Sequence, residues 1–175
     1  TKTLNKDLYN SIIDGEHILN NKKGDYINIY ACFDIYFIKQ KNVTGLPFIQ
    51  KSEDTKETDT SRLNILNHLI KNLDIKSFNN KSNIIFNIII KKFYANDIFK
   101  SCLLLLNNIN SGSYEYNTDG LIFTPAYTSV GSNKLNVKAP NYRITWLDSF
   151  KWKPPEYNTI DFLVKFKRNS NNEKI

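Results

Sequence analysis

The sequence contains no methionine, and arginine, cysteine and tryptophan are scarce in it. Because its 175 residues begin at Thr1 without the usual initiator residue, we expect the chain to be a piece of a longer protein. Two cysteines, Cys32 and Cys102, are too few for a disulfide framework, and their spacing is unlike that of a zinc site. We expect both thiols to be reduced and buried.

Long apolar runs are also missing. No run reaches the roughly 18 apolar residues that a membrane-spanning helix needs, and no signal peptide is recognisable. We therefore expect a soluble protein of a reducing compartment, not secreted and without a membrane partner. The length is sufficient for one domain with its own hydrophobic core.

Positive charge and a few residue types are abundant instead. The net charge is +7, and lysine, asparagine and isoleucine are the favoured residues, a bias that is typical of an AT-rich genome. A basic surface favours anionic partners such as nucleotides or nucleic acid. A lysine-rich surface that only aids solubility explains the charge equally well.

A β-hairpin is expected near the start of the chain. Residues 8–19 predict a strand that is interrupted by the polar group at 14–16, and residues 21–25 predict a turn. In the next strand, 26–38, the odd positions from Ile27 to Phe37 are all apolar. Alternation of this kind indicates a strand near the middle of a sheet.

Two helices are expected after a polar loop at 50–60. The first covers 62–73, with Thr60 or Ser61 as its N-cap. The second covers about 97–107, starts at Asn96 or Asp97, and buries an apolar run from Leu103 to Leu106.

The remaining segments predict strands rather than helices. Further strands are expected at 83–93, 120–124, 143–153 and 159–167. Together these elements predict an α+β fold of mainly antiparallel sheets flanked by helices.

Two of the stretches that carry chemistry lie in the hairpin. In Ile12-Ile13-Asp14-Gly15-Glu16, two carboxylates interrupt an apolar strand, and they are costly to bury unless they bind something. A solvent-exposed bulge at a sheet edge explains them as well. Phe33-Asp34 lies within the long strand, where Phe33 can be plain core and Asp34 needs a partner.

The other two stretches follow the second helix. In "YNTDGLIFTP", residues 116–125, Asp119-Gly120 precedes a strand-like run, and Asn117 stands where a nucleophilic Lys-x-Asp-Gly signature would have its lysine. In "FKWKPP", Lys151 and Lys153 point to the same strand face, which suits a phosphate. The alternative is an exposed strand edge protected by lysines.

The order of the four stretches resembles that of the covalent nucleotidyltransferases. Asp-Gly-Glu comes first, then an aromatic-Asp pair in a strand, then Asp-Gly-Leu-Ile-Phe, then Lys-x-Lys-Pro followed by "NTIDF". Within these enzymes the chain looks most like the guanylyltransferase domain of mRNA capping enzymes, because "KWKPPEYNTIDF" at 151–162 is close to their typical form. One such motif is a weak signal, whereas four in order over residues 11–162 are specific.

The resemblance implies a fold and a domain boundary. It implies a nucleotidyltransferase (ATP-grasp-like) core over residues 1–168, followed by a polar tail at 169–175. In that family the nucleophile motif precedes Asp-Gly-Glu, so Asn117 is not a replaced lysine. We expect the nucleophile to lie before Thr1, and the C-terminal oligonucleotide-binding fold to be absent from this chain.

The resemblance also implies an activity. The parent enzyme would transfer GMP from GTP to a lysine, and then to the 5′-diphosphate end of RNA. Lys151 and Lys153 would be catalytic and bind the nucleotide phosphate, and Phe33 would stack on guanine. Asp119 and Glu16 would bind Mg²⁺ or Mn²⁺, and Glu16 could hold the ribose instead. Asp34 could serve only to order its strand.

Other functions remain open at this point. A polynucleotide ligase of the same superfamily, using ATP or NAD, shares the lysine chemistry but usually lacks "NTIDF". A non-catalytic module that binds RNA or a protein subunit is the third alternative. The parent chain could carry other capping domains. The lysine and asparagine bias suggests a large DNA virus, which implies a cytoplasmic site in a viral factory or virion; otherwise the location would be nuclear.

Overall fold

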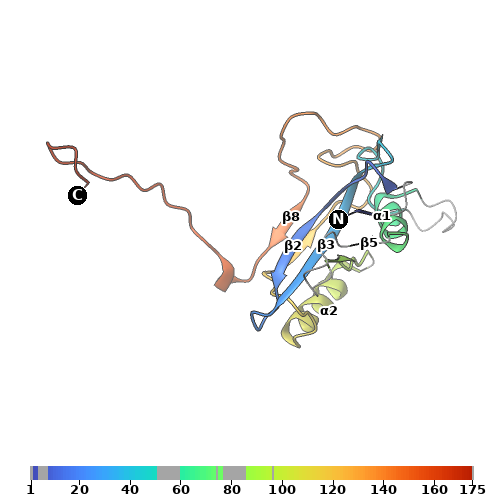
Figure 1. The fold of residues 1–175 in the computed structure, drawn as a ribbon, viewed down its shortest axis with the longest axis horizontal. Helices are drawn as coiled ribbons and strands as arrows, with labels where there is room; N and C mark the ends of the chain where they lie inside the picture. Colours follow the sequence, from blue (N-terminus) through green and yellow to red (C-terminus); the bar gives the residue numbers. More distant parts are fainter. Residues whose placement is uncertain are drawn as a thin grey trace.

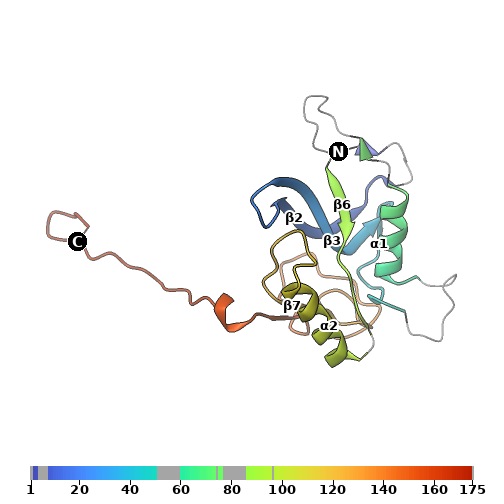
Figure 2. The ribbon, with the colours of Figure 1, turned by 90° about the horizontal axis from the view of Figure 1, so that it is seen from below.

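The structure is a computed structural model that describes residues 2–3, 8–50, 60–73, 75–76, 86–95 and 97–174. A four-stranded sheet forms its centre (Figures 1 and 2). Strand β3 (Tyr26–Ile38) lies in the middle, antiparallel to β2 (Ile12–Asn20) and β4 (Lys41–Asn42) and parallel to β6 (Asn87–Ile90). The predicted hairpin and the central position of its second strand are therefore confirmed.

Alternation along β3 is broken by β-bulges, which the sequence pattern did not predict. Asp34 pairs with Asp14 and Cys32 with Gly15, so Phe33 is an extra residue without a partner on β2. Tyr36 is a second extra residue. Each extra residue shifts the side chains that follow to the other face. Even-numbered Cys32 and odd-numbered Ile35 can therefore enter the same core.

Helix α1 (Arg62–Lys71) covers one face of this sheet. Its Leu66 and Leu69 pack into the core with Cys32, Ile35 and Val43. Ser61 is the N-cap, because its side chain accepts a hydrogen bond from Asn64 N. The predicted helix is confirmed and ends at Lys71, two residues before the predicted boundary, with Asn72 as its C-cap.

Helix α2 (Ile98–Asn110) begins after Asp97, whose side chain accepts hydrogen bonds from the backbone nitrogens of Phe99 and Lys100. The predicted burial of its leucine run is wrong. Leu103 is 61% exposed and Leu104 46% exposed. Four consecutive leucines spread around most of a helical turn, so a helix on the outside of the molecule cannot bury all of them.

Two small strand pairs complete the described secondary structure. Strand β1 (Lys2–Thr3) pairs with β5 (Ile75–Lys76), and β7 (Leu121–Phe123) pairs with β8 (Phe150–Trp152), both antiparallel. The chain is thus α+β, with mostly antiparallel strands and two helices in its described part. The strand expected at 143–153 is shorter than predicted and covers only β8. The start of the strand expected at 83–93, the candidate cap Asn96 and most of the loop at 50–60 fall outside the described residues.

The end of the chain leaves the body as an extended tail (Figure 1). After a short 3-10 helix, η2 (Pro155–Tyr157), the residues up to 167 form no strand. The strand expected at 159–167 is therefore wrong, because no described segment lies beside it to supply the backbone hydrogen bonds that a strand needs. Apolar side chains of this tail are largely exposed, among them Ile160, Phe162 and Leu163. In the described part of the chain no helix has the length and apolar character to cross a membrane.

Candidate functional site

One cluster of side chains gathers around Phe33. The ammonium of Lys91 lies 2.8 Å from Glu16 Oε2 and 5.6 Å from the centre of the Phe33 ring. The backbone explains this arrangement, since Glu16 pairs with Ala31 across the sheet and Lys91 N donates a hydrogen bond to Cys32 O. Two expected site residues, Glu16 and Phe33, are therefore brought together by a lysine that was not predicted.

The bulge at Phe33 places its ring in this cluster. Phe33 is half-buried, whereas its neighbours Cys32 and Asp34 are buried. An extra residue in a strand re-aims its side chain, and such bulges are frequent beside binding sites. The ring is neither core nor freely exposed. A planar ligand that replaced the Lys91 ammonium could stack against it.

Residues just before Asp119 approach the same cluster. Burial raises the pKa of the Tyr116 phenol, and the neighbouring Tyr114 and the Glu16 carboxylate raise it further. Tyr114 and Tyr116 have ring centres 6.1 Å apart. Lys22, in the turn of the hairpin, donates a backbone hydrogen bond to Glu115 O. The segment 114–119 thus connects Glu16 with the second group of predicted residues.

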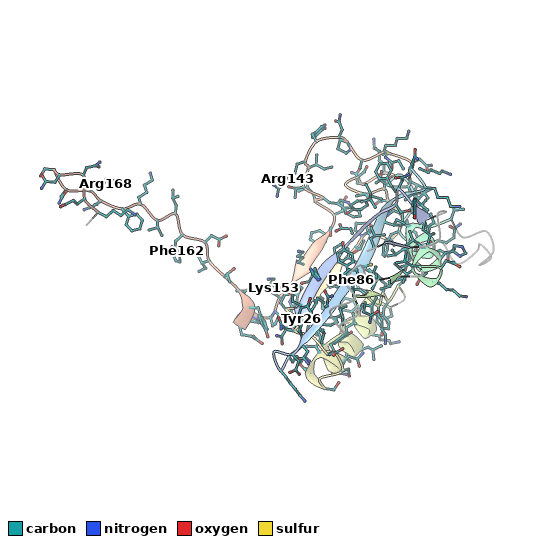
Figure 3. The ribbon with its side chains drawn as sticks, viewed as in Figure 1. Tyr26, Phe86, Arg143, Lys153, Phe162 and Arg168 are labelled. Atoms are coloured by element: carbon teal, nitrogen blue, oxygen red, sulfur yellow. The ribbon has the colours of Figure 1, made fainter. Side chains whose placement is uncertain are left out.

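That second group lies around β7 and β8. Lys153 Nζ is 2.7 Å from Asp119 Oδ2, and both side chains are exposed. The hydrogen bond from Lys153 lowers the pKa of the Asp119 carboxyl, burial opposes this effect, and the charges of Lys153 and Lys151 lower the pKa further. Figure 3 shows Lys153 where the body meets the tail. Asp119, Lys151 and Lys153 therefore form one cluster of two lysines and a carboxylate.

Gly120 makes this contact possible. Its φ is +143°, and a Cβ atom at this position would lie 2.0 Å from Trp152 O. Only glycine lets the backbone after Asp119 approach β8 this closely. Gly120 is therefore a requirement of the β7–β8 pairing, and the pairing brings Asp119 to Lys153.

Two of the acidic residues singled out in the sequence are bound to partners outside both clusters. Asp14 accepts hydrogen bonds from Tyr36 Oη and Gly15 N. Asp34 is buried and forms two contacts with Arg62, Nε–Oδ1 at 2.8 Å and Nη2–Oδ2 at 3.1 Å. Asp34 therefore orders its strand, and Glu16 is the acid of its motif that reaches the cluster.

The two acids expected to bind a metal lie in separate ion pairs. Glu16 is bound to Lys91 and Asp119 to Lys153. The described residues contain no group of three or more His, Cys, Asp or Glu side chains that could hold a metal ion. Mg²⁺ is often held by one or two carboxylates together with substrate phosphates and water. Asp119, exposed and ionised, fits that type of site.

A hollow of about 370 Å³ is lined by Leu63 and Asn67 of α1 and by residues 90–94. Lys91 belongs to both the hollow and the Phe33 cluster.

Lys91, Tyr116 and Arg62 were missed by the sequence reasoning. Tyr116 lies within the stretch "YNTDGLIFTP", but its proximity to Glu16 depends on the tertiary structure. Lys91 follows the apolar run Ile88–Ile90, and a lysine directly after an apolar strand is a signal that could have identified it.

Comparisons with known proteins add no relative to this description. No family model matches the chain, and a search of curated proteins finds no match.

Proposed function

We propose that the chain is part of an mRNA guanylyltransferase, which transfers GMP from GTP to a lysine and then to the 5′-diphosphate end of RNA. Four motifs in the family's order support this proposal. The geometric observation that carries it is the pair of clusters joined by segment 114–119. One offers an aromatic ring and a carboxylate, and the other offers two lysines and a carboxylate.

The Phe33 cluster would bind the nucleoside. A guanine ring stacked on Phe33 has to displace the Lys91 ammonium, which lies over the ring in the unliganded chain. Glu16 would then be free to accept a hydrogen bond from the ribose hydroxyls. The ribose hydrogen bond would replace the contact of Glu16 with Lys91, and base stacking would replace the contact of the Lys91 ammonium with the ring.

The β7–β8 cluster would hold the phosphates. Lys151 and Lys153 supply positive charge where the α-phosphate gains negative charge during transfer. A lysine nitrogen attacks the α-phosphorus, the bond to the bridging oxygen of pyrophosphate breaks, and the attacking amine loses its proton. Asp119 would hold a divalent cation, which neutralises phosphate charge when bound. Lys153 then leaves Asp119 and contacts phosphate.

Nucleotide binding by the chain itself tests this function. We expect GTP to bind more tightly than ATP, and Lys153→Ala to weaken GTP binding by about tenfold or more, the equivalent of one charge-assisted contact. Lys167→Ala, in the exposed tail, is the matched control and should change the affinity by less than about twofold. Equal binding of ATP and GTP would favour the ligase alternative, and no nucleotide binding would favour a non-catalytic module.

A second experiment concerns the covalent step. The chain contains no Lys-x-Asp-Gly motif, so labelled GTP with Mg²⁺ or Mn²⁺ should leave no label on it after a denaturing gel. A lysine-linked label would place the nucleophile within these residues and contradict the assignment of the motifs.

A further inference from the structure

Arg62 is a fully buried arginine at the first turn of α1, and its guanidinium contacts three separate segments. Two of its nitrogens bind the Asp34 carboxylate of β3, at 2.8 and 3.1 Å. Its Nη1 donates to Leu46 O and, at 3.2 Å, to Thr128 O. An arginine can satisfy these acceptors at once because its donors form a planar fork.

Two of these contacts, with Asp34 and with Thr128, lie next to different parts of the candidate site. Asp34 directly follows Phe33, so its carboxylate fixes the second residue of the bulge that presents the ring. Asp34 Oδ1 also accepts a hydrogen bond from Ile35 N at 2.7 Å, which holds the carboxylate against the backbone just after the bulge. Thr128 follows β7, the strand that begins two residues after Asp119.

The segments on either side of Arg62 are otherwise connected through the loop after β4. Phe48 N and Ile49 N donate to Ala126 O, and Val130 N donates to Thr44 O. These bonds join the loop to the residues after β7, and Val43 N of the same loop donates to Tyr36 O of β3. Arg62 adds a direct side-chain connection from Asp34, next to Phe33, to the residues after β7, and its guanidinium lies 5.5 Å from the centre of the Phe48 ring.

We infer that Arg62 is a positioning residue that sets the spacing between the base-stacking ring Phe33 and the phosphate-binding strands β7 and β8. This inference rests on the proposed function. A nucleotide that spans both clusters binds tightly only if their spacing matches its own length, because the second contact is then made at high effective concentration. Each cluster alone binds its half of the nucleotide without that requirement.

The test compares a whole ligand with its two halves. Guanosine, tripolyphosphate and GTP are titrated into the chain and into Arg62→Lys, at a temperature where circular dichroism shows both to be folded. Lysine keeps the charge but cannot bind Asp34 at two points and also reach both carbonyls. We expect affinities for guanosine and tripolyphosphate within about threefold of wild type, and a loss of about tenfold or more for GTP. Arg143→Lys, the same change at an exposed arginine, should leave all three affinities unchanged.

The possible results separate this inference from the proposed function. A folded Arg62→Lys variant that binds GTP within about twofold of wild type overturns the inference, as does an equal loss for all three ligands. Wild-type chain that binds GTP no more tightly than tripolyphosphate overturns the proposed function, and the inference with it. If Arg62→Lys does not fold, Asp34→Asn, which keeps the side-chain shape, carries the same test with the same outcomes.

Discussion

At the scale of single residues, Phe33 decides whether the proposed base contact exists. Replacing it with alanine should weaken GTP binding by roughly 1–3 kcal/mol, the usual contribution of base–aromatic stacking. The fold should survive, because the ring is only half-buried. Titration with GTP and a thermal melt measure both effects, with Phe162→Ala in the tail as control. Loss of cooperative melting would show that the ring is core.

Cys32 gives a prediction for alkaline pH. Burial raises the pKa of its thiol to about 11 from 9.0. The folded protein therefore keeps a proton that the unfolded chain loses above pH 9, so stability falls as pH rises from 9 to 11. Cys32→Ala should flatten this part of the stability curve in denaturant titrations at a series of pH values. Cys102→Ala should leave the slope unchanged, and an equal slope in both variants would contradict the assignment.

Single residues also show how far sequence reasoning reached. The motifs singled out Asp119, Lys151 and Lys153, and the pairing of β7 with β8 that brings them together is visible only in the structure. The position of Lys91 beside Glu16 and Phe33 was not predicted, because it depends on parallel pairing between β3 and β6, which are far apart in sequence. Asp34 was identified as needing a partner, but nothing in the chain indicated that Arg62 would be that partner.

At the scale of elements, the β7–β8 pair depends on Gly120. Gly120→Ala should separate these strands, because its Cβ would collide with Trp152 O and its φ of +143° is unfavourable for alanine. GTP binding should fall as strongly as in Lys153→Ala, since Asp119 and Lys153 lose their common frame. Gly112→Ala is the matched control, with φ of +74° and open space around the added Cβ. The Gly112 variant carries backbone strain without a collision, so a larger effect of Gly120→Ala reports the collision with Trp152 O.

A result in which both glycine variants bind GTP equally well would contradict this account of β7 and β8. A weaker effect on thermal stability than on binding is expected, because each strand has three residues and lies outside the main core.

The elements differ in how well their sequences predicted them. The hairpin and α1 were predictable, since alternation and helical spacing extend over many residues. The bulges were not, because an extra residue leaves an apolar pattern intact and becomes visible only through the partner strand. The bounds of β8 could not be predicted for a related reason, because they depend on which residues pair with β7.

At the scale of the whole molecule, the class was predictable and the course of the C-terminal segment was not. The apolar pattern at 159–167 predicted a strand that the structure does not contain, because pairing needs a neighbouring strand that no described residue provides. Deleting residues 159–175 should therefore leave the melting temperature unchanged within about 2 °C. Solubility should increase, because exposed apolar segments of this kind associate. Light scattering and calorimetry measure the two effects, and a clearly lower melting temperature would show that the tail stabilises the body.

The same tail affects how the molecule moves through solvent. Friction depends on the largest dimension of a particle more than on its volume, and the tail extends far from the body (Figure 1). The 20.4 kDa chain should elute early from a sizing column calibrated with globular standards and sediment slowly for its mass. A monomer would then elute at the volume expected for a globular dimer. The oligomeric state therefore has to be measured by a method that reports molar mass, such as mass photometry or sedimentation equilibrium.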